Sequence, residues 1–126
     1  MADGSAADCL LAVLAKAPVP GRVKTRMMPD LTAEQCAALQ AACLADVVRR
    51  PFPADRRVLW ITGGESEMWQ EAAALGWEVA QQPEGDLGVK MCAAIDEGLT
   101  RSPRVLILGT DAPDLPPTLL EQAFTA

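Results

Sequence analysis

The chain has 126 residues and a net charge of −6, with 11 basic and 17 acidic side chains, and half of its residues are hydrophobic. This length predicts one domain with a single core. The acidic balance argues against sequence-independent binding of nucleic acid or anionic lipid. No apolar run approaches the roughly 20 residues of a membrane-spanning helix, and the first residues lack the basic start of a signal peptide. We therefore expect a cytoplasmic protein.

The sequence contains no histidine and no tyrosine. The commonest general base and the commonest zinc ligand are therefore missing, as is every Ser-His-Asp or Cys-His arrangement. The four cysteines form no C-x-x-C pair, so we expect them to be small buried hydrophobic residues in a reducing compartment. Any chemistry must depend on carboxylates, lysine, arginine, backbone amides and a hard metal ion.

Strand patterns and helix patterns alternate along the whole chain. Apolar runs predict strands at residues 9–14, 58–62, 77–81 and 105–108, of which 77–81 is the weakest and is expected at a sheet edge. A capping box over residues 32–35 opens a helix that runs to about Arg50, and a second helix is predicted from about Glu65 to Leu75. A last short helix begins near Pro116. The third helix carries an apolar stripe, and this stripe consists of Leu87, Met91, Ile95 and Leu99.

Strands that alternate with helices predict right-handed βαβ units, and hence an α/β fold in which a parallel sheet lies between two layers of helices. In such sheets, ligands bind beyond the carboxyl ends of the strands, where the strand order reverses. If the second and third strands lie on one side of the first and the fourth lies on the other, two loops flank that position. They follow Leu14 and Leu108, and they have the most unusual sequences of the chain.

The first of these loops is strongly basic in an acidic chain. Four basic residues and no acidic one lie between Lys16 and Met28. Arginine offers a fork to two phosphate oxygens, lysine a point charge and the backbone its amides, so the loop is suited to a polyphosphate. The alternative is a solvated loop that balances the acidic surface. The nucleotide-binding candidates here are Lys16, Gly21, Arg22, Lys24, Thr25 and Arg26.

Two further sites are predicted from carboxylates and glycines at strand and helix ends. Asp111 follows the fourth strand and is placed to hold Mg²⁺ or Mn²⁺ against substrate phosphates. Asp114 is a candidate second ligand, or alternatively a helix cap. The segment Gly85-Asp86-Leu87-Gly88 precedes a helix, so Gly85, Asp86 and Gly88 are nucleotide-binding candidates, although Asp86 could equally be an N-cap.

Three segments resemble a bacterial group of nucleotide-diphospho-sugar transferase-like proteins with the GT-A fold, often labelled arsenosugar-biosynthesis glycosyltransferases. They are L-A-K-A-P-V-P-G-R-V-K-T-R at 14–26, G-D-L-G-V-K-M at 85–91 and L-G-T-D-A-P-D-L-P at 108–116. The group is similar to the guanylyltransferases that act on phospholactate and molybdenum cofactor. The resemblance extends from about Leu10 to Phe124 and implies strand order 3-2-1-4. It also implies phosphate binding by the basic loop, base or ribose near Gly85–Gly88, and a divalent metal on Asp111.

Members of that group continue well beyond the position of Phe124, with a D-G-G-type segment and further strands. The resemblance therefore implies that residues 1–126 form a single nucleotide-binding α/β domain that lacks the C-terminal acceptor half. A four-stranded half-sheet exposes apolar edges, so we also expect self-association.

Three functions are compatible with these residues. The leading one is a metal-dependent transferase that uses a nucleoside diphosphate sugar as donor. The first alternative is a nucleotidyltransferase that acts on an NTP and a phosphorylated acceptor. The second is a truncated, non-catalytic nucleotide-binding module.

Overall fold

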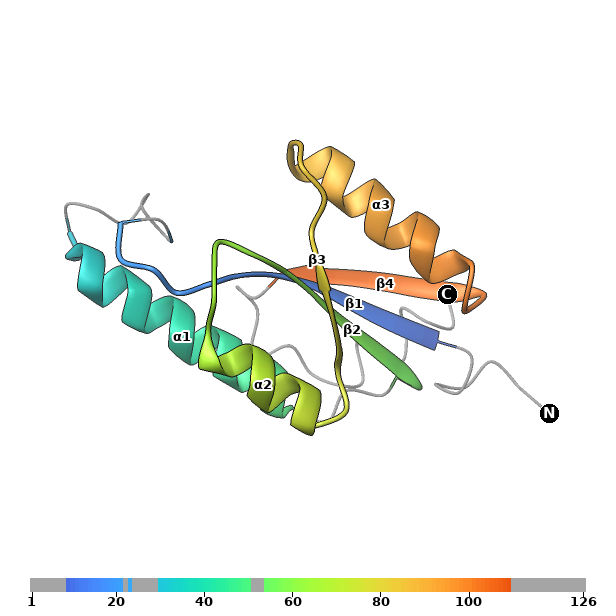
Figure 1. Ribbon diagram of the computed structural model, residues 1–126, viewed down its shortest axis with the longest axis horizontal. Coiled ribbons are helices and arrows are strands. Elements are labelled where there is room, and N and C mark those ends of the chain that lie inside the picture. The colour runs from blue at the N-terminus through green and yellow to red at the C-terminus, as the bar shows by residue number, and fades with distance from the viewer. Residues whose placement is uncertain (1–8, 22, 24–29, 51–53, 110–126) are drawn as a thin grey trace.

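A computed structural model of the chain describes residues 9–21, 23, 30–50 and 54–109, and in them a parallel sheet carries helices on both faces (Figure 1). Strands and helices alternate strictly, as predicted. The elements are β1 (Cys9–Lys16), α1 (Ala33–Arg49), β2 (Arg56–Thr62), α2 (Glu67–Ala74), β3 (Glu78–Gln81), α3 (Leu87–Leu99) and β4 (Arg104–Gly109). None of the helices within these residues is long and apolar enough to cross a membrane.

The four strands lie in the order β3-β2-β1-β4, and every neighbouring pair is parallel. The predicted order 3-2-1-4 is confirmed, and so is the edge position of β3. Along β1, residues 10–16 pair with Arg56–Thr62 of β2, while residues 9–14 pair with Arg104–Gly109 of β4. The strand order therefore reverses beside β1, which places the predicted ligand crevice between the carboxyl ends of β1 and β4.

Alternate residues of β1 supply the two halves of the core. Cys9, Leu11 and Val13 pack in the larger cluster with residues of α1 and α2. Leu10 and Ala12 belong to the smaller cluster on the opposite face, which includes Ala94 of α3. Figure 1 shows the same division, with α1 and α2 on one side of the sheet and α3 on the other. Because both of its faces are covered, β1 is apolar from Cys9 to Ala15 rather than alternating.

Local signals set the helix ends where the sequence predicts them. The Thr32 side chain accepts a hydrogen bond of 3.1 Å from the amide of Gln35, whose side chain in turn accepts one of 2.9 Å from the amide of Thr32. This is the predicted capping box of α1. Helix α2 is capped by Ser66, and its end is followed by Gly76 at a φ of 98°, a left-handed conformation that glycine adopts without strain.

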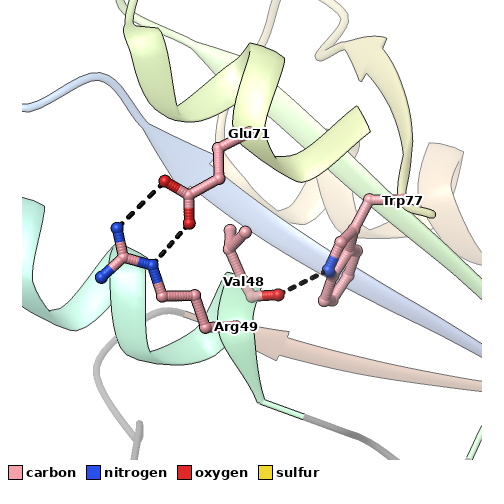
Figure 2. Close-up of polar contacts among 4 residues, drawn as sticks. All are labelled: Val48, Arg49, Glu71 and Trp77. Carbon is pink, nitrogen blue, oxygen red and sulfur yellow. Dashed lines mark hydrogen bonds and ion pairs between the residues drawn. The ribbon is translucent and has the colours of Figure 1, made fainter. Parts of the chain in front are cut away.

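Polar contacts join the end of α1 to the middle of α2 and to the residue before β3, as Figure 2 shows. Arg49 of α1 forms a two-bonded ion pair with Glu71 of α2, in which Nη2 and Oε1 are 3.0 Å apart. The hydrogen bond from Arg49 lowers the pKa of the Glu71 carboxyl, and Glu71 raises the pKa of Arg49. Next to this pair, the indole N–H of Trp77 donates to the carbonyl of Val48 at 3.0 Å. The two helices thus form one layer.

The apolar stripe predicted on α3 is not the face that packs against the sheet. Leu87 and Leu99 are 64% and 51% exposed, and Met91 and Ile95 are each 37% exposed. The buried residues of α3 are Ala94 and Gly98 instead. A Cβ atom on Gly98 would lie 2.8 Å from a methyl group of Val105, so only small residues allow α3 to lie this close to β4.

The prediction that the cysteines are buried is confirmed for two of the four. Cys9 and Cys36 are buried and Cys43 is half-buried, but Cys92 is exposed on α3. The expectation of a buried Cys92 was wrong because Cys92 lies two residues from the buried Ala94, about 200° around the helix, and so on the face turned away from the sheet.

Candidate functional site

The carboxyl edge of the sheet gathers the loops that the sequence singles out. Strand β1 ends at Lys16, which is exposed and pairs with Thr62 at the end of β2. Strand β4 is described up to Gly109, the partner of Leu14. The start of the basic loop and the end of β4 therefore lie on neighbouring strands at the edge where α/β sheets bind ligands.

The basic loop begins as an ordered continuation of β1. The amide of Ala17 donates to the carbonyl of Thr62 at 2.9 Å, so pairing with β2 goes one residue beyond the strand. The amide of Val19 then donates to the carbonyl of Ala17 at 2.8 Å, which closes a tight turn around Pro18. Gly21 has a φ of 82°, the left-handed region that favours glycine. The loop thus leaves the strand by a defined path as far as Gly21.

Two glutamine side chains hold the last carbonyl groups of β1. Gln40 of α1 is 4% exposed, and its Nε2 donates to the carbonyl of Lys16 at 3.0 Å. Gln82 follows β3, and its Nε2 donates to the carbonyls of Ala15 at 3.1 Å and Trp60 at 2.9 Å. Because Gln82 reaches β1, it also places the segment that leads to Gly85 beside the start of the basic loop.

Gln40 and Gln82 are not among the site residues predicted from the sequence. A signal was present for Gln40, which occupies the position between Cys36 and Leu44 on the buried face of α1. A polar residue at four-residue spacing within an apolar stripe requires a buried hydrogen-bond partner. For Gln82, no comparable pattern exists.

The second predicted loop forms the N-terminus of α3. The Asp86 carboxylate accepts a hydrogen bond of 2.9 Å from the amide of Val89 and so caps the helix, which is one of its two predicted roles. Gly85 has a φ of 131°, and a Cβ there would lie 2.9 Å from the Val89 side chain. Gly88 is exposed in the first turn. Contact of Gly85, Asp86 and Gly88 with a nucleotide stays a prediction.

Six predicted site residues lie outside the described residues, and these are Arg22, Lys24, Thr25, Arg26, Asp111 and Asp114. Within the described ranges, no group of three histidine, cysteine or acidic side chains could hold a metal ion. The Mg²⁺ or Mn²⁺ site therefore remains a prediction that depends on Asp111 and Asp114.

The three tryptophans of the chain serve the core rather than an exposed stacking surface. Trp60, Trp69 and Trp77 are each at most 7% exposed. The Trp69 indole N–H donates to the carbonyl of Gly64 at 3.0 Å, and that of Trp77 to Val48. A base bound at this edge would consequently be contacted by groups other than these rings.

Comparisons with known proteins agree with the fold. A family model described as "Uncharacterized protein conserved in bacteria (DUF2064)" matches residues 44–126. A search of curated protein sequences finds no match. Among solved structures, the chain is similar to the crystal structure of a "putative nucleotide-diphospho-sugar transferase" from Desulfovibrio desulfuricans G20, with a TM-score of 0.74 and 25% sequence identity. The similarity covers 93% of this chain and 53% of the other, so this chain spans about half the length of that structure.

Proposed function

The chain belongs to the bacterial DUF2064 family, and from this membership and its transferase-like fold we propose that it binds a nucleoside diphosphate sugar as the donor of a transferase reaction. The observation that carries the proposal is the strand order β3-β2-β1-β4. This order brings the loop that starts at Lys16 and the end of β4 together at the switch point of the sheet. The similarity to the Desulfovibrio structure supports the same substrate class.

The basic loop is proposed to bind the diphosphate. Lys16 is exposed at the end of β1, and Arg22, Lys24 and Arg26 follow within ten residues. A charge-assisted hydrogen bond contributes about 1.5–3 kcal/mol, and micromolar binding requires about 8 kcal/mol, so at least three of them are needed to bind a diphosphate at that affinity. A divalent cation held by Asp111, with Asp114 as a candidate second ligand, would neutralise charge on the departing diphosphate.

The Gly85–Gly88 segment is proposed to lie against the base or ribose. Glycines at 85 and 88 leave backbone groups accessible at the start of α3, and main-chain donors and acceptors can contact base edges. The sequence resemblance to arsenosugar-biosynthesis glycosyltransferases is part of the same proposal, because it concerns which sugar is transferred.

Calorimetric titration with UDP, GDP, CDP and dTDP, with and without Mn²⁺, tests the proposal. We expect metal-dependent binding of one nucleotide. Lys24→Ala and Asp111→Ala should each weaken it at least about tenfold, since each removes a charged contact to phosphate or metal. Arg56→Ala is the matched control because Arg56 is exposed at the start of β2. This position lies at the amino ends of the strands, away from the carboxyl ends where the candidate site lies. Unchanged affinity in both test variants would contradict the proposal.

A nucleotidyltransferase is the second candidate, because four cationic side chains between Lys16 and Arg26 are equally suited to a triphosphate. The two reactions differ in their products. Release of pyrophosphate from an NTP in the presence of a phosphorylated acceptor indicates nucleotidyl transfer, whereas release of a nucleoside diphosphate indicates glycosyl transfer. Nucleotide binding without either product indicates the non-catalytic module.

A further inference from the structure

Three backbone groups at the end of β1 and in the residue after it each have a partner from a different part of the fold. The carbonyl of Ala15 accepts from Gln82, the carbonyl of Lys16 accepts from Gln40, and the amide of Ala17 donates to Thr62. Strand pairing alone accounts for only one of these contacts. Two amide side chains, from α1 and from the segment after β3, supply the others.

Burial makes the contact of Gln40 costly to lose. Only Gln40 and Ser102 are buried polar residues in the described part of the chain. A buried amide without a hydrogen bond is strongly unfavourable, so retention of glutamine at this point of an otherwise apolar helix face requires a bonded arrangement. That arrangement includes the carbonyl of Lys16, the residue at which the basic loop begins.

We propose that Gln40 is a positioning residue for diphosphate binding. By holding the Lys16 carbonyl, it sets the orientation of the peptide between Lys16 and Ala17 and so the direction in which the basic loop leaves β1. This inference depends on the proposed function of that loop. The bond from Gln40 reaches the backbone carbonyl of Lys16 rather than a side chain of the loop, so through this bond Gln40 acts on the path of the loop.

A purely stabilising role would give different results from a positioning role. If Gln40 only contributes a buried hydrogen bond, its loss lowers the stability of the whole domain and affects all ligands alike. If it positions the loop, its loss weakens phosphate contacts selectively and increases local opening at Lys16 without a matching loss of stability of the whole domain.

The test compares Gln40→Met, which keeps the side-chain length but lacks the N–H donor, with Leu44→Met. Leu44 lies one turn further along the same buried face of α1 and has an apolar side chain, so this control changes the core without removing a hydrogen bond. For each protein we would measure the melting temperature and the affinity for the nucleoside diphosphate that the wild type binds. The affinity for the corresponding monophosphate provides the reference, because it lacks the second phosphate.

Trypsin cleavage of the bond between Lys16 and Ala17 is a readout that needs no ligand. The scissile carbonyl is the one that Gln40 holds, so it must be released before the protease can act on it. We expect cleavage of this bond in Gln40→Met to be roughly three to ten times faster than in Leu44→Met. The cleavage rate after Arg56, in β2, should remain the same in both variants.

The inference is supported if Gln40→Met loses about tenfold in diphosphate affinity, keeps its monophosphate affinity and is cleaved faster after Lys16. It is overturned if diphosphate affinity and cleavage match those of Leu44→Met, or if both affinities fall together with the melting temperature. A wild-type protein that binds no nucleotide contradicts the proposed function first, and the inference with it. If Gln40→Met does not fold, Gln40→Asn provides the same comparison, since the shorter amide keeps its polarity but does not reach Lys16.

Discussion

Gly98 is the residue at which α3 comes closest to β4. A Cβ on Gly98 would lie 2.8 Å and 3.2 Å from the two methyl carbons of Val105 and 3.4 Å from Leu10. Val105 is β-branched and has little rotamer freedom with which to move away. Glycine in a helix interior costs about 1 kcal/mol relative to alanine, yet here the absence of a side chain is needed for packing.

Gly98→Ala is therefore expected to destabilise the protein by about 1 kcal/mol, because an overpacking cost of about 1–3 kcal/mol exceeds the gain in helix propensity. Gly88→Ala is the matched control in the same helix, since a Cβ there would meet only an Asp86 oxygen at 3.4 Å. Urea unfolding of both variants provides the measurement. Equal or increased stability of Gly98→Ala would show that the helix can shift away from Val105.

The pair of Arg49 and Glu71 predicts a pH dependence with a definite sign. The pKa of the Glu71 carboxyl in the folded protein is lowered from its ordinary value of 4.5. The ion pair therefore stabilises the folded protein above pH 4.5, and this stabilisation is lost as the pH falls through the lowered pKa. Glu71→Gln should lower the melting temperature slightly at neutral pH, because exposed pairs contribute little. The difference from wild type should vanish in acid. A difference that is constant across the acid range would contradict the assignment.

At the scale of elements, the helix starts combine stability with the candidate site. Thr32 and Gln35 cap α1 reciprocally, and Ser66 caps α2. Asp86 differs from these because it caps α3 and also belongs to a predicted nucleotide-binding segment. Its carboxylate could serve both purposes, since one oxygen bonds the Val89 amide.

Substitutions of Asp86 separate these two roles. Asp86→Ala should destabilise the protein by about 1 kcal/mol through loss of the cap, whereas Asp86→Asn should retain most of the stability because asparagine is an equally good N-cap. Thermal unfolding measures this effect. Nucleotide titration of Asp86→Asn then tests the second role, for which we expect weaker binding at unchanged stability. Full affinity in Asp86→Asn would leave Asp86 with the structural role alone.

At the scale of the whole molecule, the described residues leave apolar surface on one side of the sheet. Strand β4 is half-buried along Val105–Leu108, and it pairs only with β1 among the described strands. Four apolar residues of α3, the helix that packs against β4, are exposed as well. Exposed apolar stripes and strand edges favour association with a further surface of the same kind, and a second copy of the chain provides one.

The self-association expected from the sequence thus stays a prediction with a simple measurement. Light scattering at tens of micromolar should give a mass above 13.4 kDa for the wild type. Leu99→Lys should lower this mass, while Thr100→Lys introduces the same charge at the next exposed position as a control. A wild-type mass equal to that of one chain would contradict the prediction.

Within the described residues, the sequence by itself determined the elements and their approximate ends, whereas the helix predicted near Pro116 lies outside these residues. Apolar runs, helical periodicity, the capping box at Thr32 and the stop at Gly76 act within a few residues, so they can be read in order along the chain. The strand order 3-2-1-4 was predicted as well, through the resemblance of three loop motifs to a known fold, and it indicates which loops share one edge.

Only the tertiary structure decided which face of α3 is buried and how β1 ends. The larger apolar residues of α3 predict the wrong face, because close approach to Val105 requires the small side chains of Ala94 and Gly98. The amides of Gln40 and Gln82 meet the end of β1 across 24 and 67 residues of sequence. No local pattern encodes contacts at that separation, since they exist only after the sheet and its helices have packed.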